Sequence, residues 1–171
     1  MTGVQTCARP ICPGEGNSIT VTAEHRDQFG NVSAPGTDSA KVDTLAGLDG
    51  SAPTVTLTED ANNDGVINAA ELSGDIDVRI DLPAGTVAGD SIRVSDGTIT
   101  RDIVLSAQDI TNGTIVTSFP SPGEGNSITV TAEHRAQFEN VTAPGTDSAK
   151  VDTLAGLGGS APTEQIARAH V

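Results

Sequence analysis

Aromatic side chains are almost absent from this chain of 171 residues, which contains three phenylalanines and neither tryptophan nor tyrosine. Sugar-binding surfaces and the hot spots of protein–protein interfaces usually depend on such rings. Their scarcity argues against a large ligand-binding platform and against a small-molecule substrate site. The hydrophobic core must therefore be built mainly from valine, isoleucine, leucine and alanine.

Basic residues are also scarce, because 9 lysines and arginines stand against 23 acidic residues and leave a formal net charge of −14. Such a surface repels the phosphates of nucleic acids and of anionic membranes, which excludes both as default partners. The sequence has no apolar run long enough to insert into a membrane. The acidic balance suits a protein whose carboxylates are partly neutralised by bound divalent cations.

The strongest positive feature is an internal repeat, in which residues 13–54 return almost unchanged as residues 122–163. The offset is 109 residues, which is too long for one solenoid turn and fits one domain per repeat. We therefore expect the C-terminal part of one repeat (13–50), a complete repeat (51–159) and the start of a third (160–163). Only four of the 42 aligned positions differ: Asp27/Ala136, Gly30/Glu139, Ser33/Thr142 and Asp49/Gly158.

Both ends of the chain resemble translated sequencing adapter. The first residues match the translation of a common adapter except at Arg9, and the last residues match its complementary strand except at Ala167. The repeat stops at the same two points. Residues 1–12 and 164–171 are therefore expected to be non-native, and they are set aside in predicting the fold.

The two cysteines, Cys7 and Cys12, both fall in the adapter-like N-terminal stretch. The remaining sequence has no thiol for a disulfide, a thiolate metal site or a nucleophile. It also shows no Ser/His/Asp cluster, nucleophile elbow or phosphate-binding loop, so we do not expect an enzyme. His25 and His134 occupy equivalent positions in the two copies, and the sequence predicts that both are surface residues rather than zinc ligands.

The complete repeat reads as a series of short strands separated by turn residues. The clearest is 75–82, where Ile76, Val78, Ile80 and Leu82 alternate with charged residues. About seven such strands in one repeat predict an all-β fold, an immunoglobulin-like β-sandwich. The expected strands are 53–58, 75–82, 91–95, 98–105, 114–119, 127–133 and 147–153, with one helical turn at 106–110.

The segments outside these strands have their own predicted roles. Residues 154–162, rich in small side chains, are expected to form a short hinge between sandwiches. The partial repeat 13–50 holds only two strands, which are marginal alone. It is expected to be poorly ordered or to pair at an open edge of the complete sandwich.

One constellation carries chemistry, because residues 60–71 match the pattern D-x-[DN]-x-[DN]-G-x5-E at every position. In this pattern alternate residues direct oxygens at one centre, a glycine permits the sharp reversal, and a closing glutamate binds through both oxygens. Hard oxygen ligands favour Ca²⁺ over zinc or copper. The predicted ligands are the side chains of Asp60, Asn62, Asp64, Asn68 and Glu71 and the carbonyl of Val66.

The flanks of this loop differ from those of an EF-hand, because Thr54–Thr58 reads as a strand instead of an entering helix. We therefore expect a fixed structural site between the first two strands, not a sensor that opens a groove. The alternative is an ordinary surface turn. Asp147 and Asp152 are weaker candidates for a second calcium site at the hinge, and are otherwise expected to be solvated.

The complete repeat resembles the bacterial Ig-like repeats of giant secreted adhesins of the RTX and biofilm-associated type. The resemblance is carried by VTLTEDANNDGVINAAELSGDIDVRIDLP, the SDG turn, IVLSAQDITNG and the closing VTAEHRAQFENV and DSAKVDT segments. It implies a secreted protein of the bacterial cell surface, in which many neighbouring repeats form a calcium-stiffened stalk that supports cell adhesion and biofilm formation.

A second function class stays open at this point. An Ig-like accessory or ligand-binding module of a secreted carbohydrate-active enzyme has the same size and strand pattern. That alternative predicts a neighbouring catalytic domain and exposed aromatic side chains.

Overall fold

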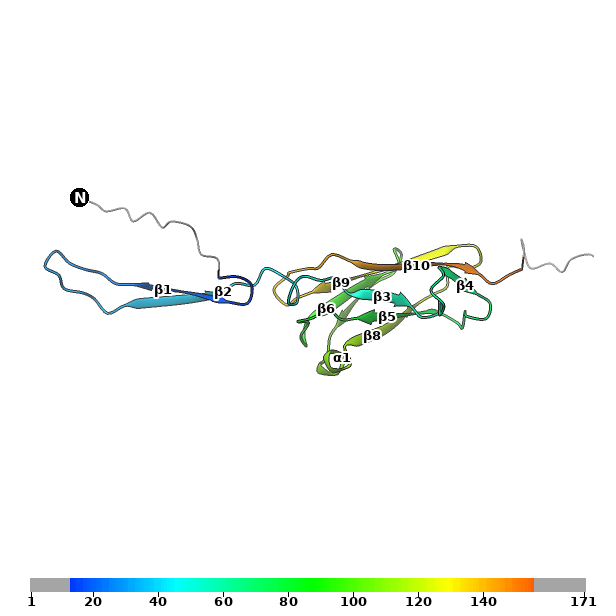
Figure 1. Ribbon diagram of the computed structural model, residues 1–171, viewed down its shortest axis with the longest axis horizontal. Helices are drawn as coiled ribbons and strands as arrows, with labels where there is room; N and C mark the ends of the chain where they lie inside the picture. The colour runs from blue at the N-terminus through cyan, green and yellow to red at the C-terminus, as the bar shows by residue number, and fades with distance from the viewer. Residues whose placement is uncertain (1–12, 156–171) are drawn as a thin grey trace, which may run out of the picture.

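The computed structural model describes residues 13–155, and the termini at 1–12 and 156–171 lie outside the described part together with the predictions made for them. The described chain is nearly all β and forms an isolated hairpin followed by a sandwich of two sheets (Figure 1). The predicted all-β sandwich is thereby confirmed. No helix within residues 13–155 is long and apolar enough to cross a membrane.

The sandwich pairs a three-stranded sheet with a five-stranded one. The smaller sheet has the order β3 (Thr54–Leu57), β5 (Ile76–Asp81), β8 (Thr114–Phe119). The larger has the order β4 (Val66–Asn68), β10 (Gly145–Asp152), β9 (Ser127–Arg135), β6 (Ser91–Ser95), β7 (Thr100–Val104). All pairs are antiparallel except β4 with β10.

The core lies between the sheets and follows the alternation of each strand. In β9 the inward side chains are Ile128, Val130 and Ala132, and their neighbours point to solvent or to the rim. The largest fully buried side chain is Phe119 at the end of β8. Because residue i and residue i+2 share one face of a strand, these positions were readable as core from the sequence.

Two contacts join the first and last strands of the sandwich across the sheets. The carboxylate of Asp147 in β10 accepts a hydrogen bond of 2.8 Å from the backbone N–H of Leu57 in β3. A Cβ on Gly145 would lie 1.8 Å from the carbonyl oxygen of Pro53, so only glycine permits this approach. Asp147, expected to be solvated or a calcium ligand, is thus half-buried and ties β3 to β10.

The complete repeat contains eight strands, one more than predicted. The additional strand is β4, which is only three residues long and lies inside the predicted calcium loop. It pairs in parallel with the end of β10, with Val66 opposite Lys150 and Asn68 opposite Asp152. A three-residue strand has too few alternations to be recognised in a stretch dominated by turn residues.

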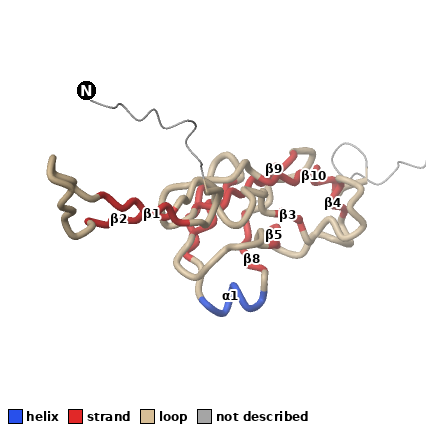
Figure 2. Tube along the Cα trace, turned by 60° about the vertical axis from the view of Figure 1, so that its left-hand side comes forward, coloured by secondary structure: helices blue, strands red, loops and turns tan. Residues whose placement is uncertain are grey.

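The predicted helical turn is present as α1 (Ala107–Asn112). Ser106 caps its N-terminus by accepting the N–H of Asp109, and the Asp109 carboxylate accepts the N–H of Ser106 in return. Gly113 ends the helix in the left-handed conformation. Figure 2 shows α1 on a loop that projects from the sheets.

The partial repeat forms a hairpin of β1 (Ser18–Ala23) and β2 (Gly36–Lys41). Its register repeats that of β9 and β10, since Ser18 pairs with Lys41 as Ser127 pairs with Lys150. Both strands are exposed along their whole length, and they pair with each other rather than with the sandwich. Of the two alternatives expected for this segment, pairing at an open sandwich edge is wrong, because β1 and β2 form a separate two-stranded sheet.

Phe119→Ala tests the position of the core. The ring is fully buried between the sheets, so its removal leaves a cavity and is expected to lower the free energy of unfolding by about 3–5 kcal/mol. Phe138 is 75% exposed, and Phe138→Ala is expected to change it by less than about 0.5 kcal/mol. Urea denaturation measures both, and equal effects of the two variants would contradict this assignment of the core.

Candidate functional site

The predicted calcium loop follows β3 and contains β4, and two buried acidic side chains lie where it starts. Glu59 accepts the N–H of Asp77 at 2.6 Å, which ties the end of β3 to β5. Asp60 is 5% exposed, and its two carboxylate oxygens accept the N–H groups of Asp64 at 3.0 Å and Gly65 at 2.9 Å. Asp60 therefore organises the loop, because it holds residues 64 and 65 close to the first residue of the loop.

The next residues form successive turns closed by side chains. Asn62 Oδ1 accepts the N–H of Asp64 at 2.9 Å, and Asp64 Oδ1 accepts the N–H of Val66 at 2.9 Å. Asn63 and Gly65 have positive φ angles of 55° and 82°, which reverse the chain. Alternate residues of the loop thus present carboxylate or amide oxygens, as the sequence pattern requires.

The last two predicted ligands lie at the end of the loop and interact with each other. One Glu71 oxygen accepts both the backbone N–H of Asn68 at 3.0 Å and its side-chain amide at 2.6 Å. Asn68 Oδ1 accepts the N–H of Ala70 at 2.8 Å. This reciprocal arrangement resembles a capping box and fixes the turn after β4.

The loop offers a hard-oxygen donor set, which fits calcium by its chemistry. Within residues 13–155, however, no three His, Cys, Asp or Glu side chains gather into a metal-binding group. Asp60 and Asp64 share one set of turns, whereas Glu71 is engaged by Asn68. The carbonyl of Gly65 accepts the N–H of Lys150, which attaches the loop to β10. Calcium binding stays a prediction.

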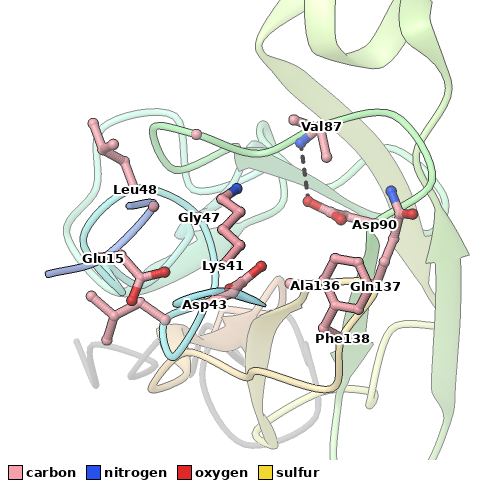
Figure 3. Close-up of a pocket in the computed structure, with 13 residues that line it drawn as sticks. Glu15, Lys41, Asp43, Gly47, Leu48, Val87, Asp90, Ala136, Gln137 and Phe138 are labelled. Carbon is pink, nitrogen blue, oxygen red and sulfur yellow. Dashed lines mark hydrogen bonds between the residues drawn. The ribbon is translucent and has the colours of Figure 1, made fainter. Parts of the chain in front are cut away.

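A second site, not predicted from the sequence, lies where the partial repeat meets the sandwich. A cavity of about 330 Å³ is lined on one side by residues that include Glu15, Asp43 and Gly47. The opposite side includes Asp90 and Phe138 of the sandwich (Figure 3). The cavity therefore marks the contact between two successive repeats.

Beneath this contact His134 and Asp90 form a buried pair. His134 is 0% exposed and Asp90 3%, and His134 Nε2 lies 2.9 Å from Asp90 Oδ2. The same Asp90 oxygen accepts the N–H of Val87 at 3.0 Å. The prediction of a surface histidine is wrong for His134, because it continues the inward face of β9 two residues beyond Ala132. His25, its counterpart in the hairpin, is exposed.

The segment leading out of β2 rests on this end of the sandwich. Ala46 is 2% exposed, and Leu48 donates its N–H to the carbonyl of Ala84 at 2.9 Å. A Cβ on Gly47 would lie 2.7 Å from that carbonyl and 3.6 Å from His134 Nδ1. His134 Nδ1 has no hydrogen-bond partner among the described residues. The linker thus covers the histidine.

Each copy of the repeat fixes the start of this linker with the same contact. Glu15 accepts the N–H and the hydroxyl of Thr44 at 3.0 and 2.8 Å. Glu124 accepts both groups of Thr153 at 2.8 Å. These hydrogen bonds lower the pKa of both glutamates below the ordinary value of 4.5. We refer to each of these pairs as a Glu–Thr clasp.

No protein-family model matches the chain, and no curated protein matches it in sequence. It is similar to a solved structure described as "Structural insight into host cell surface retention of a 1.5-MDa bacterial ice-binding adhesin". The two are 24% identical with a TM-score of 0.41, over 80% of this chain and 42% of the other. This similarity is too distant to carry an argument about function.

His134→Ala tests the buried pair. The change removes a buried ring and leaves the Asp90 carboxylate without it, so the free energy of unfolding is expected to fall by about 3 kcal/mol. His25→Ala is the matched control in the exposed copy, with an expected change below about 0.5 kcal/mol. If thermal or urea denaturation gives the same small change for both variants, the His134–Asp90 pair does not stabilise the sandwich.

The Glu–Thr clasps predict a defined pH dependence. A glutamate whose pKa is lower in the folded than in the unfolded protein stabilises the fold at pH values above its unfolded pKa. This stability is lost as the pH falls through the folded pKa, where the carboxylate becomes protonated. The NMR signal of the Thr44 amide should therefore be constant from neutral pH to about pH 5 and shift at lower pH. Glu15→Gln should abolish this titration at Thr44 and leave that of Thr153 intact. A titration at Thr44 that persists in Glu15→Gln would show that another group causes it.

Proposed function

We propose that the chain is a segment of an extended stalk in a large bacterial cell-surface adhesin, composed of tandem sandwiches stiffened by calcium. The supporting observation is the path of the chain, which enters the complete sandwich at one end and leaves at the opposite end (Figure 1). Near-identical domains linked in this way add length with every copy. The resemblance of the repeat to the Ig-like repeats of giant adhesins supplies the biological setting.

The position of the predicted calcium loop supports a structural role for the ion. The loop adjoins the end of β10, because β4 pairs with residues 150–152 and Gly65 accepts the N–H of Lys150. Residues 60, 62, 64, 66, 68 and 71 would hold the ion there. A bound ion would neutralise carboxylates that otherwise repel one another, and would stabilise the exit of the chain toward the next repeat.

Calcium is expected to raise the thermal midpoint of unfolding relative to chelator. Modules of extracellular proteins bind calcium with dissociation constants of about 10⁻⁴ to 10⁻³ M. At about 10 mM calcium, mass action then contributes roughly 1.4–2.7 kcal/mol. Asp64→Ala should abolish the response, whereas Asp49→Ala, at a position where the second copy has Gly158, should preserve it. An unchanged midpoint in the parent chain would overturn the calcium assignment.

The proposed stalk predicts how the length of the protein depends on the number of repeats. In a protein of four to eight tandem copies of residues 51–159, the maximum dimension from small-angle X-ray scattering should increase linearly with copy number in calcium. Flexible linkage would instead give growth with about the square root of the number of copies. Square-root growth in calcium would contradict the proposed stalk.

A further inference from the structure

We infer that residues 43–48 and the facing end of the sandwich form a specific inter-repeat joint, whose strength is set by the residue at position 136. The inference rests on the proposed tandem arrangement and names the surfaces through which successive repeats contact each other. The receiving face consists of Ala84, Gly85, Asp90, His134 and Asn140.

The joint is held by hydrogen bonds and by close backbone packing. Asn140 donates its side-chain amide to Asp43, at 2.9 Å to Oδ1 and 3.3 Å to the carbonyl. Leu48 donates its backbone N–H to the carbonyl of Ala84 at 2.9 Å. A Cβ on Gly85 would lie 2.4 Å from the Leu48 nitrogen, so the two backbones are in direct contact. These contacts join residues separated by up to 97 positions, and they fix the linker on the following repeat.

A difference between the two copies explains why Asn140 is available. In the hairpin its counterpart Asn31 donates its side-chain amide to Asp27 Oδ2 at 2.7 Å, within the same turn. The complete repeat has Ala136 in place of Asp27, which cannot accept this bond. The Asn140 amide is thereby released for Asp43 of the preceding repeat.

Position 136 therefore decides how the turn uses its asparagine. With alanine, the amide binds the incoming linker. With aspartate, the amide is retained inside the turn, and a further carboxylate is placed near that of Asp43. Repeats of the two kinds would accept the preceding repeat with different strength, although they are otherwise almost identical in the aligned segment.

The same linker sequence leads out of the complete repeat, because residues 152–157 read DTLAGL as residues 43–48 do. One repeat thus carries both halves of the joint. Its C-terminal linker contacts the following repeat, and the face at its other end contacts the linker of the preceding repeat. A following copy of the complete repeat would present the same receiving face to residues 152–157.

Hydrogen exchange of the Leu48 amide in the full chain tests the joint directly. We expect this amide to be protected in the parent chain, because it is bonded to Ala84. Asn140→Ala and Ala136→Asp should each accelerate its exchange about tenfold, the effect of losing one or two hydrogen bonds. Asn31→Ala and Asp27→Ala, the same positions in the hairpin, should leave it within about twofold.

Ala136→Asp is the sharper variant, since the equivalent turn of the hairpin accommodates aspartate. It should retain the thermal midpoint of the sandwich while weakening the joint. An unprotected Leu48 amide in the parent chain would overturn the joint. Acceleration by Asn140→Ala but not by Ala136→Asp would overturn the role of position 136.

A lengthened chain, residues 13–159 followed by a second copy of 51–159, tests whether the joint recurs. The Leu157 amide should then be protected to the same extent as that of Leu48, and its fast exchange would confine the joint to the first junction. These measurements are made in chelator, so that failure of the calcium prediction leaves them unaffected. Loss of Leu48 protection, conversely, leaves the calcium-dependent midpoint unaffected.

Discussion

The close approach of β3 to β10 is the constraint on which the rest of the sandwich depends. β10 belongs to the larger sheet and β3 to the smaller one, and Asp147 joins them by accepting the N–H of Leu57. Gly145 leaves room for the Pro53 carbonyl at the same crossing. With the first and last strands held together, the apolar faces of both sheets close over one core, and the ends of the chain are set at opposite poles. The half-buried Asp147 carboxylate thus accepts a backbone donor from β3, which is an edge strand of the smaller sheet.

The two poles of the sandwich are built on different chemistry. The exit pole carries the acidic loop between β3 and β4, in which Asp60 is held by two backbone N–H groups. The entry pole carries the buried His134–Asp90 pair, and Gly47 of the incoming linker lies over the histidine. Burying polar side chains without full pairing is costly. The linker's backbone packs closely on this pole at two glycines, Gly47 and Gly85.

Most of the strand pattern was accessible from the sequence, because alternation and turn residues determine it locally. All seven expected strands and the helical turn of the complete repeat are present. Two residues of the sandwich escaped prediction, for different reasons. The prediction of a surface His134 follows the usual exposure of histidine and overlooks the local alternation Ile128, Val130, Ala132, which places it inward. Asp147 was predicted to be solvated or a ligand of a second calcium, and its actual partner, the Leu57 N–H, depends on the crossing of β3 with β10.

The candidate sites differ in the same way. The calcium loop was recognisable because its residues are contiguous and their spacing has a chemical reason. The joint was not, because its two halves are far apart in the chain. A signal nevertheless existed: of the four substitutions between the copies, one exchanges Asp27 for Ala136, four residues before an unchanged asparagine. When the acceptor is lost but the donor asparagine is retained, the asparagine is expected to donate to a different acceptor.

The topology also determines how the sandwich resists extension. The last strand, β10, pairs in parallel with β4, and both run toward the exit pole. A force that pulls the ends of the repeat apart along this direction shears the β4–β10 and β3–β10 contacts, so that several hydrogen bonds must break together. Strands that are peeled from a sheet lose their bonds one at a time. The chain ends lie at opposite poles. Stretching a tandem chain would therefore load the contact between β3 and β10 in shear.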